Sequence, residues 1–251
     1  MISKKWNVKA LLLCHLMMAI LISTFLWPVT RVFWDGMDAV FFKTINGSLS
    51  LGKPWQLFWA FANHKLADWV EDIVILTFFA IHIRRAAKEL RPRKGAELLF
   101  CALYIALIIY FVNRMLFRKY LEIPRESPTL VFDSSIRLSE MIPWLRIKDD
   151  SPRCFPGDHA TTAILFAASY FYYSGWKRGS FAAIYAAFLC MPRLITGAHW
   201  LSDVIIGSGS IALFFLSWAF CTPLHTWFID QFEKLIMFIR KIPSRLYAAR
   251  Q

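Results

Sequence analysis

The chain has 251 residues, of which 57% are hydrophobic, and its formal net charge at pH 7 is +12. A mean hydropathy of +0.45 is too high for one soluble domain, so the composition indicates an integral membrane protein. We attribute most of the positive charge to basic residues that face anionic lipid headgroups, and this reading requires no nucleic-acid partner.

Six apolar runs follow one another at 11–29, 69–83, 96–117, 160–174, 180–197 and 204–222. Several approach the ~20 residues that a helix needs to span a bilayer. We therefore predict an all-α integral membrane protein with a bundle of six transmembrane helices, formed by a single domain over residues 1–251. The first run resembles a signal peptide, but it is long and lacks a clear cleavage site before Pro28. We interpret it as a retained helix.

Basic residues gather in the segments that would lie on one side of such a bundle. They are Lys4, Lys5 and Lys9, the stretch 84–94, the turn 176–178, and Lys234, Arg240, Lys241, Arg245 and Arg250. Because cytoplasmic loops collect Lys and Arg, we predict that both termini are cytoplasmic and that 30–67 and 118–153 face the opposite side. The five cysteines show no paired spacing, so neither a disulfide framework nor a zinc site is indicated.

The first cluster of chemical interest is "RKYLEIPRESPTL" at 118–130, directly after the third apolar run. Arg118, Lys119 and Arg125 can direct fixed positive charge at a phosphate, and arginine can do so with two parallel hydrogen bonds. The competing interpretation is a basic cluster that only anchors a helix end at the membrane surface.

The second cluster is "CFPGDH" at 154–159. Pro156 and Gly157 predict a turn before a helix that starts near His159, with Asp158 as its N-cap. The amides at a helix N-terminus point at anions, and a histidine there can donate a proton. The competing interpretation is a capping turn with an incidental histidine.

The third cluster is "PRLITGAHWLSDV" at 192–204. His199 and Asp203 are four residues apart, so on a helix they would share a face, and the carboxylate would hold one imidazole nitrogen. The other nitrogen is then free as a nucleophile, and Arg193 can bind the oxygens of the phosphoryl group that it attacks. The competing interpretation is a buried structural pair, but ionisable residues at a membrane boundary favour function.

The order of these clusters resembles the type 2 phosphatidic acid phosphatase superfamily, whose motifs are Lys-x6-Arg-Pro, Pro-Ser-Gly-His and Ser-Arg-x5-His-x3-Asp. The third motif matches at Arg193, His199 and Asp203, and the second at His159, with Gly157-Asp158 replacing Ser-Gly. The first motif departs most: Arg118 or Lys119 takes the Lys position, and Glu126 follows Arg125 where proline is expected. Within the superfamily, "SPTL", "CFPGDH" and "PRLITGAHWLSDVIIGS" are similar to the bacterial lipid A 1-diphosphate synthases.

This resemblance implies an enzyme of the bacterial inner membrane whose active site faces the periplasm. It would transfer a phosphoryl group from undecaprenyl diphosphate to the 1-phosphate of lipid A. The resemblance and the residue chemistry agree on the roles: His199 attacks and becomes phosphohistidine, Asp203 orients it, and His159 protonates the leaving oxygen. The phosphoryl oxygens would be bound by Arg118 or Lys119, Arg125, Arg193 and the amides at Gly157 and Asp158, with no metal or other cofactor.

Two alternatives stay open at this point. A lipid phosphatase acting on undecaprenyl diphosphate or phosphatidylglycerol phosphate would use the same motifs, with water as the acceptor. A transporter or lipid-binding scaffold would use the histidine and aspartate to relay a proton or bind a headgroup. The sequence does not reveal the oligomeric state.

Overall fold

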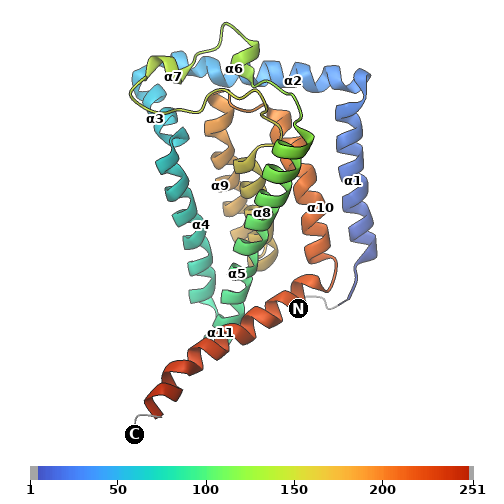
Figure 1. Ribbon diagram of the computed structural model, residues 1–251, viewed down its shortest axis with the longest axis vertical. Helices are drawn as coiled ribbons and strands as arrows, with labels where there is room; N and C mark the ends of the chain where they lie inside the picture. Colours follow the sequence, from blue (N-terminus) through green and yellow to red (C-terminus); the bar gives the residue numbers. More distant parts are fainter. Residues whose placement is uncertain (1–4, 249–251) are drawn as a thin grey trace.

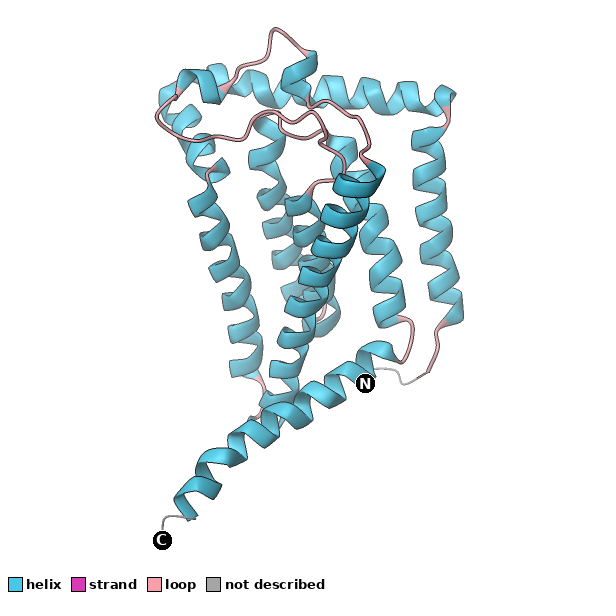
Figure 2. Ribbon diagram, in the orientation of Figure 1, coloured by secondary structure: helices cyan, strands magenta, loops and turns pink. Residues whose placement is uncertain are grey.

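The computed structural model describes residues 5–248, with side chains as far as residue 241. Within that part of the chain there is no β-strand, only an isolated bridge between Arg125 and Arg153 (Figure 2). The long helices are α1 (Val8–Leu26), α2 (Pro28–Gly47), α3 (Lys53–Asn63), α4 (Lys65–Arg85), α5 (Arg91–Ile108), α8 (Asp158–Ser174), α9 (Trp176–Ile195), α10 (Gly209–Phe220) and α11 (Leu224–Ala248). Short or irregular helices are η1 (Ser48–Leu51), η2 (Lys88–Leu90), η3 (Ile109–Leu121), α6 (Pro128–Val131), α7 (Leu138–Met141) and η4 (Asp203–Ser208).

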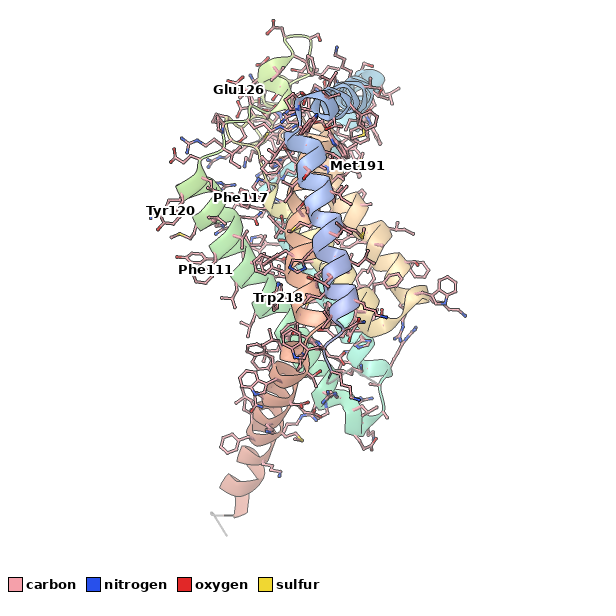
Figure 3. The ribbon with its side chains drawn as sticks, turned by 90° about the vertical axis from the view of Figure 1, so that its right-hand side faces the viewer. Phe111, Phe117, Tyr120, Glu126, Met191 and Trp218 are labelled. Carbon is pink, nitrogen blue, oxygen red and sulfur yellow. The ribbon has the colours of Figure 1, made fainter. Side chains whose placement is uncertain are left out.

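Three helical stretches among the described residues are long and apolar enough to cross a membrane. They are Val8–Leu26, Lys88–Leu121 and Asp203–Phe220. Large apolar side chains project from them, as Phe111 and Tyr120 do from η3 (Figure 3), where they are 58% and 67% exposed. Such a surface suits contact with lipid. The predicted all-α membrane protein is therefore confirmed as a fold class, and the number of spans stays a prediction.

The long helices run side by side, while α2 lies across one end of the bundle and α11 extends obliquely from the other (Figure 1). Trp27 has an extended backbone conformation and separates α1 from α2. Pro28 occupies the first position of α2, where a missing N–H costs no helical hydrogen bond. The first apolar run, predicted to continue to residue 29, thus ends as a helix at Leu26.

The two helices that carry most of the site, α8 and α9, pack closely against each other. Phe166 and Tyr170 of α8 are buried in the largest apolar cluster, together with Phe79 of α4. Gly179 lets α9 approach, since a Cβ atom at this position would lie 2.5 Å from the ring of Phe171. This packing fixes the N-terminus of α8 relative to the C-terminal end of α9.

Candidate active site

His199 lies in a turn between two helices and not on a helix, contrary to the prediction. α9 ends at Ile195, and Gly197 adopts φ 81°, a left-handed conformation that favours glycine. Its N–H donates to the carbonyl of Leu194. A Cβ atom at Gly197 would also lie 2.6 Å from Thr129 Cγ2, so any other residue would clash. The glycine thereby ends α9 and leaves His199 on the turn that follows.

The predicted pairing of His199 with Asp203 is present despite this different backbone. His199 Nδ1 lies 3.4 Å from Asp203 Oδ2, and the same oxygen accepts the Trp200 N–H at 2.9 Å. Asp203 is fully buried. Because Nδ1 faces the carboxylate, Nε2 is the nitrogen left to react, and no hydrogen bond within the described residues engages it.

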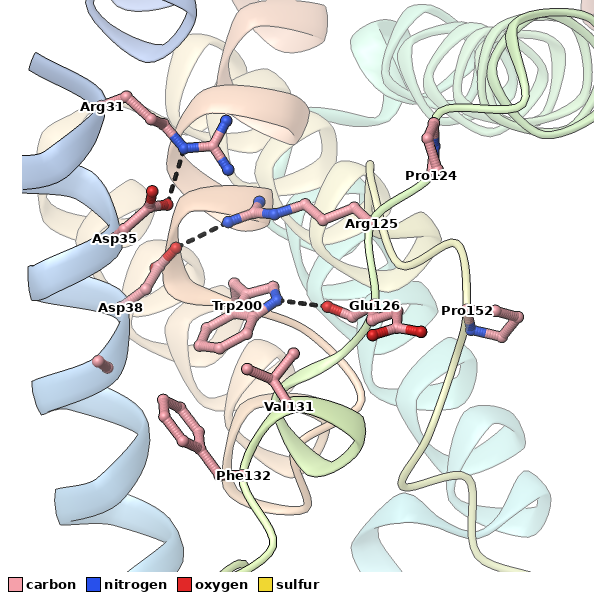
Figure 4. Close-up of a pocket in the computed structure, with 11 residues that line it drawn as sticks. Arg31, Asp35, Asp38, Pro124, Arg125, Glu126, Val131, Phe132, Pro152 and Trp200 are labelled. Carbon is pink, nitrogen blue, oxygen red and sulfur yellow. Dashed lines mark hydrogen bonds and ion pairs between the residues drawn. The ribbon is translucent and has the colours of Figure 1, made fainter. Parts of the chain in front are cut away.

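Arg125 contacts the carboxylate of Asp203 and does not simply project toward a phosphate. Its Nη1 donates to Asp203, and its Nη2 donates to Ser202 Oγ at 2.8 Å. Nη2 also donates to Asp38 Oδ2 at 2.8 Å (Figure 4). The guanidinium also lies 5.0 Å from the ring centroid of Phe25. The prediction that Arg125 binds phosphate stays untested, but its terminal nitrogens already hold two carboxylates.

The second predicted cluster forms the N-terminus of α8, with a different cap. The helix begins at Asp158 and Gly157 is the N-cap, so Asp158 is not the capping residue that the sequence predicts. The Asp158 carboxylate instead accepts from Arg118 Nη2 at 3.3 Å. A Cβ atom at Gly157 would lie 3.6 Å from Nδ1 of His199. The amides that open α8 therefore lie beside the imidazole of His199.

His159, in the first turn of α8, is held by a carboxylate that the sequence reasoning did not assign to the site. Its Nε2 lies 3.1 Å from Asp68 Oδ1 and 3.1 Å from Arg193 Nη2. Nε2 can donate to Asp68 or accept from Arg193, but not both, and donation to Asp68 requires a proton on Nε2. Burial alone would raise the pKa of Asp68, but the hydrogen bond and charge of His159 and the charge of Arg193 outweigh it and lower that pKa.

Arg193 is buried and its direction is set by α3. Its Nη1 donates to the backbone carbonyl of Asn63 at 2.6 Å and also to the Asn63 side chain, while Nη2 lies 3.3 Å from Asp68 Oδ1. The Asn63 amide in turn donates to Thr196 Oγ1 at 2.6 Å. Asn63 therefore fixes the guanidinium so that its other end faces His159.

The two basic residues at the end of η3 differ in their surroundings. Arg118 reaches Asp158, whereas Lys119 lies 5.7 Å from the ring centroid of Tyr120, which is largely exposed. A further cation comes from Lys148, whose pKa is lowered by burial and by the positive charges of Arg118 and Arg193. The arrangement favours Arg118 over Lys119 in the first motif and adds Lys148 to the positive residues near α8.

Two groups of three side chains each place possible metal-ligand atoms within 4.8 Å of one another. The first group is Cys154, His199 and Asp203, and the second is Asp68, Glu71 and His159. In each group an arginine is already bound to the aspartate, Arg125 in the first and Arg193 in the second. That positive charge opposes a cation at the same oxygens. We assign no metal to either group.

Four contributors were missed by the sequence reasoning: Asp38, Asn63, Asp68 and Lys148. Asp68 carried a usable signal, because a charged residue at the start of an apolar run is costly unless it has a function. The other three lie in segments between the apolar runs, where the polar residues show no motif. They join the site through contacts over long sequence separations, such as the Ser202 N–H that donates to Asp38 Oδ1 at 2.8 Å.

Comparison with known proteins agrees with this site. The PAP2 superfamily matches residues 98–233, which include the three predicted clusters. The chain is also 29% identical over 228 residues to lipid A 1-diphosphate synthase of Escherichia coli strain K12, covering 91% of this chain and 94% of that protein. No solved structure gives a significant match. The match over more than half of its length shows that this chain is a member of the PAP2 superfamily.

Proposed function

We propose that the protein transfers a phosphoryl group from undecaprenyl diphosphate to the 1-phosphate of lipid A. The observation that carries the proposal is the position of His199, whose imidazole lies beside the start of α8 with Nδ1 facing the buried carboxylate of Asp203 and Nε2 without a hydrogen bond among the described residues. The choice of lipids rests on the similarity to lipid A 1-diphosphate synthase of Escherichia coli.

The proposed reaction has two displacements at phosphorus. His199 Nε2 attacks the terminal phosphorus of the lipid diphosphate, the bond to the bridging oxygen breaks, and undecaprenyl phosphate leaves. His159 supplies the proton to that leaving oxygen. An oxygen of the lipid A 1-phosphate then attacks the phosphohistidine, which restores the free imidazole and forms the diphosphate product.

Positive charge around the phosphoryl group would stabilise both transition states. Arg193 and Arg118 both reach the first turn of α8, through their contacts with His159 and Asp158. The free amides of this turn add a positive field of their own. Fixed donors of this kind typically contribute about 3–4 kcal/mol each, and they act without a metal ion.

We also propose six membrane spans with the site on the periplasmic side. The runs at 69–83, 160–174 and 180–197 fall in α4, α8 and α9, which lie alongside the three apolar stretches. Helix α11 and the connection at 86–90 lie at the end of the bundle away from α2 and the site (Figure 1). A membrane-impermeant thiol reagent should modify Trp144→Cys from the periplasm and Lys88→Cys only after the cytoplasm is opened; the reverse pattern would overturn this orientation.

The decisive assay offers the purified protein undecaprenyl diphosphate labelled at its terminal phosphate, with and without lipid A. We expect label in lipid A, together with an acid-labile phosphoenzyme that is absent from His199→Ala. Release of inorganic phosphate alone, with lipid A present, would instead identify a phosphatase. Retained turnover in His199→Ala would refute the nucleophile.

A further inference from the structure

The buried face of α2 carries a carboxylate with no place in the three motifs. Asp38, Phe42 and Asn46 are the buried residues of this helix, and their spacing of four places them on one side. Asp38 is only 2% exposed. It also lies outside residues 98–233, which the superfamily match covers. A buried carboxylate is costly unless positive charge and hydrogen bonds compensate it, so its partners indicate its role.

The partners of Asp38 are the residues that hold the catalytic turn. It accepts from Arg125 Nη2 at 2.8 Å, from the Ser202 N–H at 2.8 Å and from the Ser202 hydroxyl. Arg125 donates its other terminal nitrogen to Asp203. One guanidinium therefore lies between two buried carboxylates, and Figure 4 shows it reaching from the 122–127 connection to α2.

This sharing has a consequence for the charge that His199 experiences. If Arg125 paired with Asp203 alone, its positive charge would offset most of the negative charge beside the imidazole. With Asp38 on the same guanidinium, a second negative charge offsets the arginine, so the net charge beside the His199 imidazole is more negative. The Ser202 contacts additionally fix the residue next to Asp203.

We propose that Asp38 is a positioning residue for the nucleophile, which acts through Arg125 and Ser202 to hold the Asp203 carboxylate in place and keeps the surroundings of His199 net negative. The proposal rests on the proposed function in that it takes His199 as the attacking group. It makes α2 a working part of the site, although this helix lies across the end of the bundle.

Several charged or titratable groups face His199 and Asp203. They are Asp38 on α2, and Arg125 and Cys154 in the connections. Replacement of Asp38 by asparagine removes one negative charge from this set and leaves the shape nearly unchanged. The imidazole then loses its proton more easily, so the acid limb of the pH profile, where His199 must be neutral to attack, should move to lower pH.

The experiment measures kcat and KM for undecaprenyl diphosphate across pH, in full-length wild type and in Asp38→Asn. We expect kcat to fall about tenfold, as for the loss of a buried charged hydrogen bond, with KM little changed and the acid limb displaced to lower pH. The matched control is Asp35→Asn, which lies on the same helix but is largely exposed and paired with Arg31 at 2.7 Å. This control should retain the wild-type kcat and profile.

Two results would overturn the proposal. One is a kcat and pH profile in Asp38→Asn equal to those of the wild type. The other is a loss of activity matched by a loss of folded protein in thermal unfolding, with an unchanged pH profile, which would make Asp38 purely structural. The His199→Ala variant distinguishes the two hypotheses. If this variant still turns over substrate, the proposed function fails. If it is inactive while Asp38→Asn has the kinetics of the wild type, only the role of Asp38 is refuted.

Discussion

Replacing Asp68 by asparagine should weaken proton donation by His159, the proposed general acid. The carboxylate lies 3.1 Å from His159 Nε2, and its side chain is 38% exposed. Two unit charges 4 Å apart interact by ~4 kcal/mol at an effective dielectric constant of 20 and by ~1 kcal/mol in water. Because solvent screens this pair, we take about 1 kcal/mol for the contact, or about a fivefold effect on the rate.

The direction of the pH effect follows from the role of His159. A general acid must be protonated, so the rate falls as pH rises through the alkaline limb. Loss of the neighbouring negative charge should therefore move that limb to lower pH. The wild-type pair is intact at neutral pH, because the pKa of Asp68 is lowered and the carboxylate is lost only as pH falls through that lowered value.

The assay is kcat/KM for release of the lipid phosphate as a function of pH, in wild type, Asp68→Asn and Asp72→Asn. Asp72 is one turn further along α4 and makes no hydrogen bond with His159, so it controls for general loss of negative charge. A substrate with a nitrophenol leaving group needs no proton and should largely rescue Asp68→Asn. An alkaline limb that stays in place in this variant would refute the reasoning.

Three further predictions concern the positively charged residues of the candidate site and its need for a metal ion. Lys148→Met should lower kcat/KM about tenfold, whereas Lys119→Met should change it little, since Lys148 experiences the charges of the site and Lys119 lies against an exposed ring. Asn63→Leu should lower both kcat and the unfolding temperature, because the buried guanidinium of Arg193 loses the Asn63 side-chain oxygen, a partner worth about 1–3 kcal/mol; an unchanged Tm would contradict this. A metal chelator should leave the steady-state rate unchanged, and strong inhibition would reveal an ion at one of the two ligand groups.

The residues that can be predicted from sequence are those whose chemistry depends on local spacing. His199 and Asp203 meet because a four-residue separation allows contact both on a helix and in the observed turn. The turn itself follows from Gly197, whose left-handed conformation was not apparent from the motif. The local pattern therefore predicted the contact between His199 and Asp203 but not the turn that carries His199.

The residues that could not be predicted lie on elements brought together only by the fold. Asp38 reaches Ser202 across 164 positions, and Asn63 reaches Arg193 across 130. No periodicity in a single chain specifies such a pairing. The same limit applies to Arg125: its spacing suggested a phosphate ligand, whereas its neighbours in space are two aspartates.

The finished site contains two imidazole–carboxylate pairs in which the same residue types are used in different surroundings. His199 pairs with Asp203, which is fully buried and bound to Arg125, and His159 pairs with Asp68, which is half-exposed and bound to Arg193. The proposed reaction needs one imidazole neutral for attack and the other protonated to release the lipid phosphate, at the same pH. Different environments around paired titratable groups are how a single site separates such roles. In the first pair Arg125 also binds Asp38, whereas within the described residues Arg193 forms an ion pair with Asp68 alone, so the carboxylates of the two pairs have different charged neighbours.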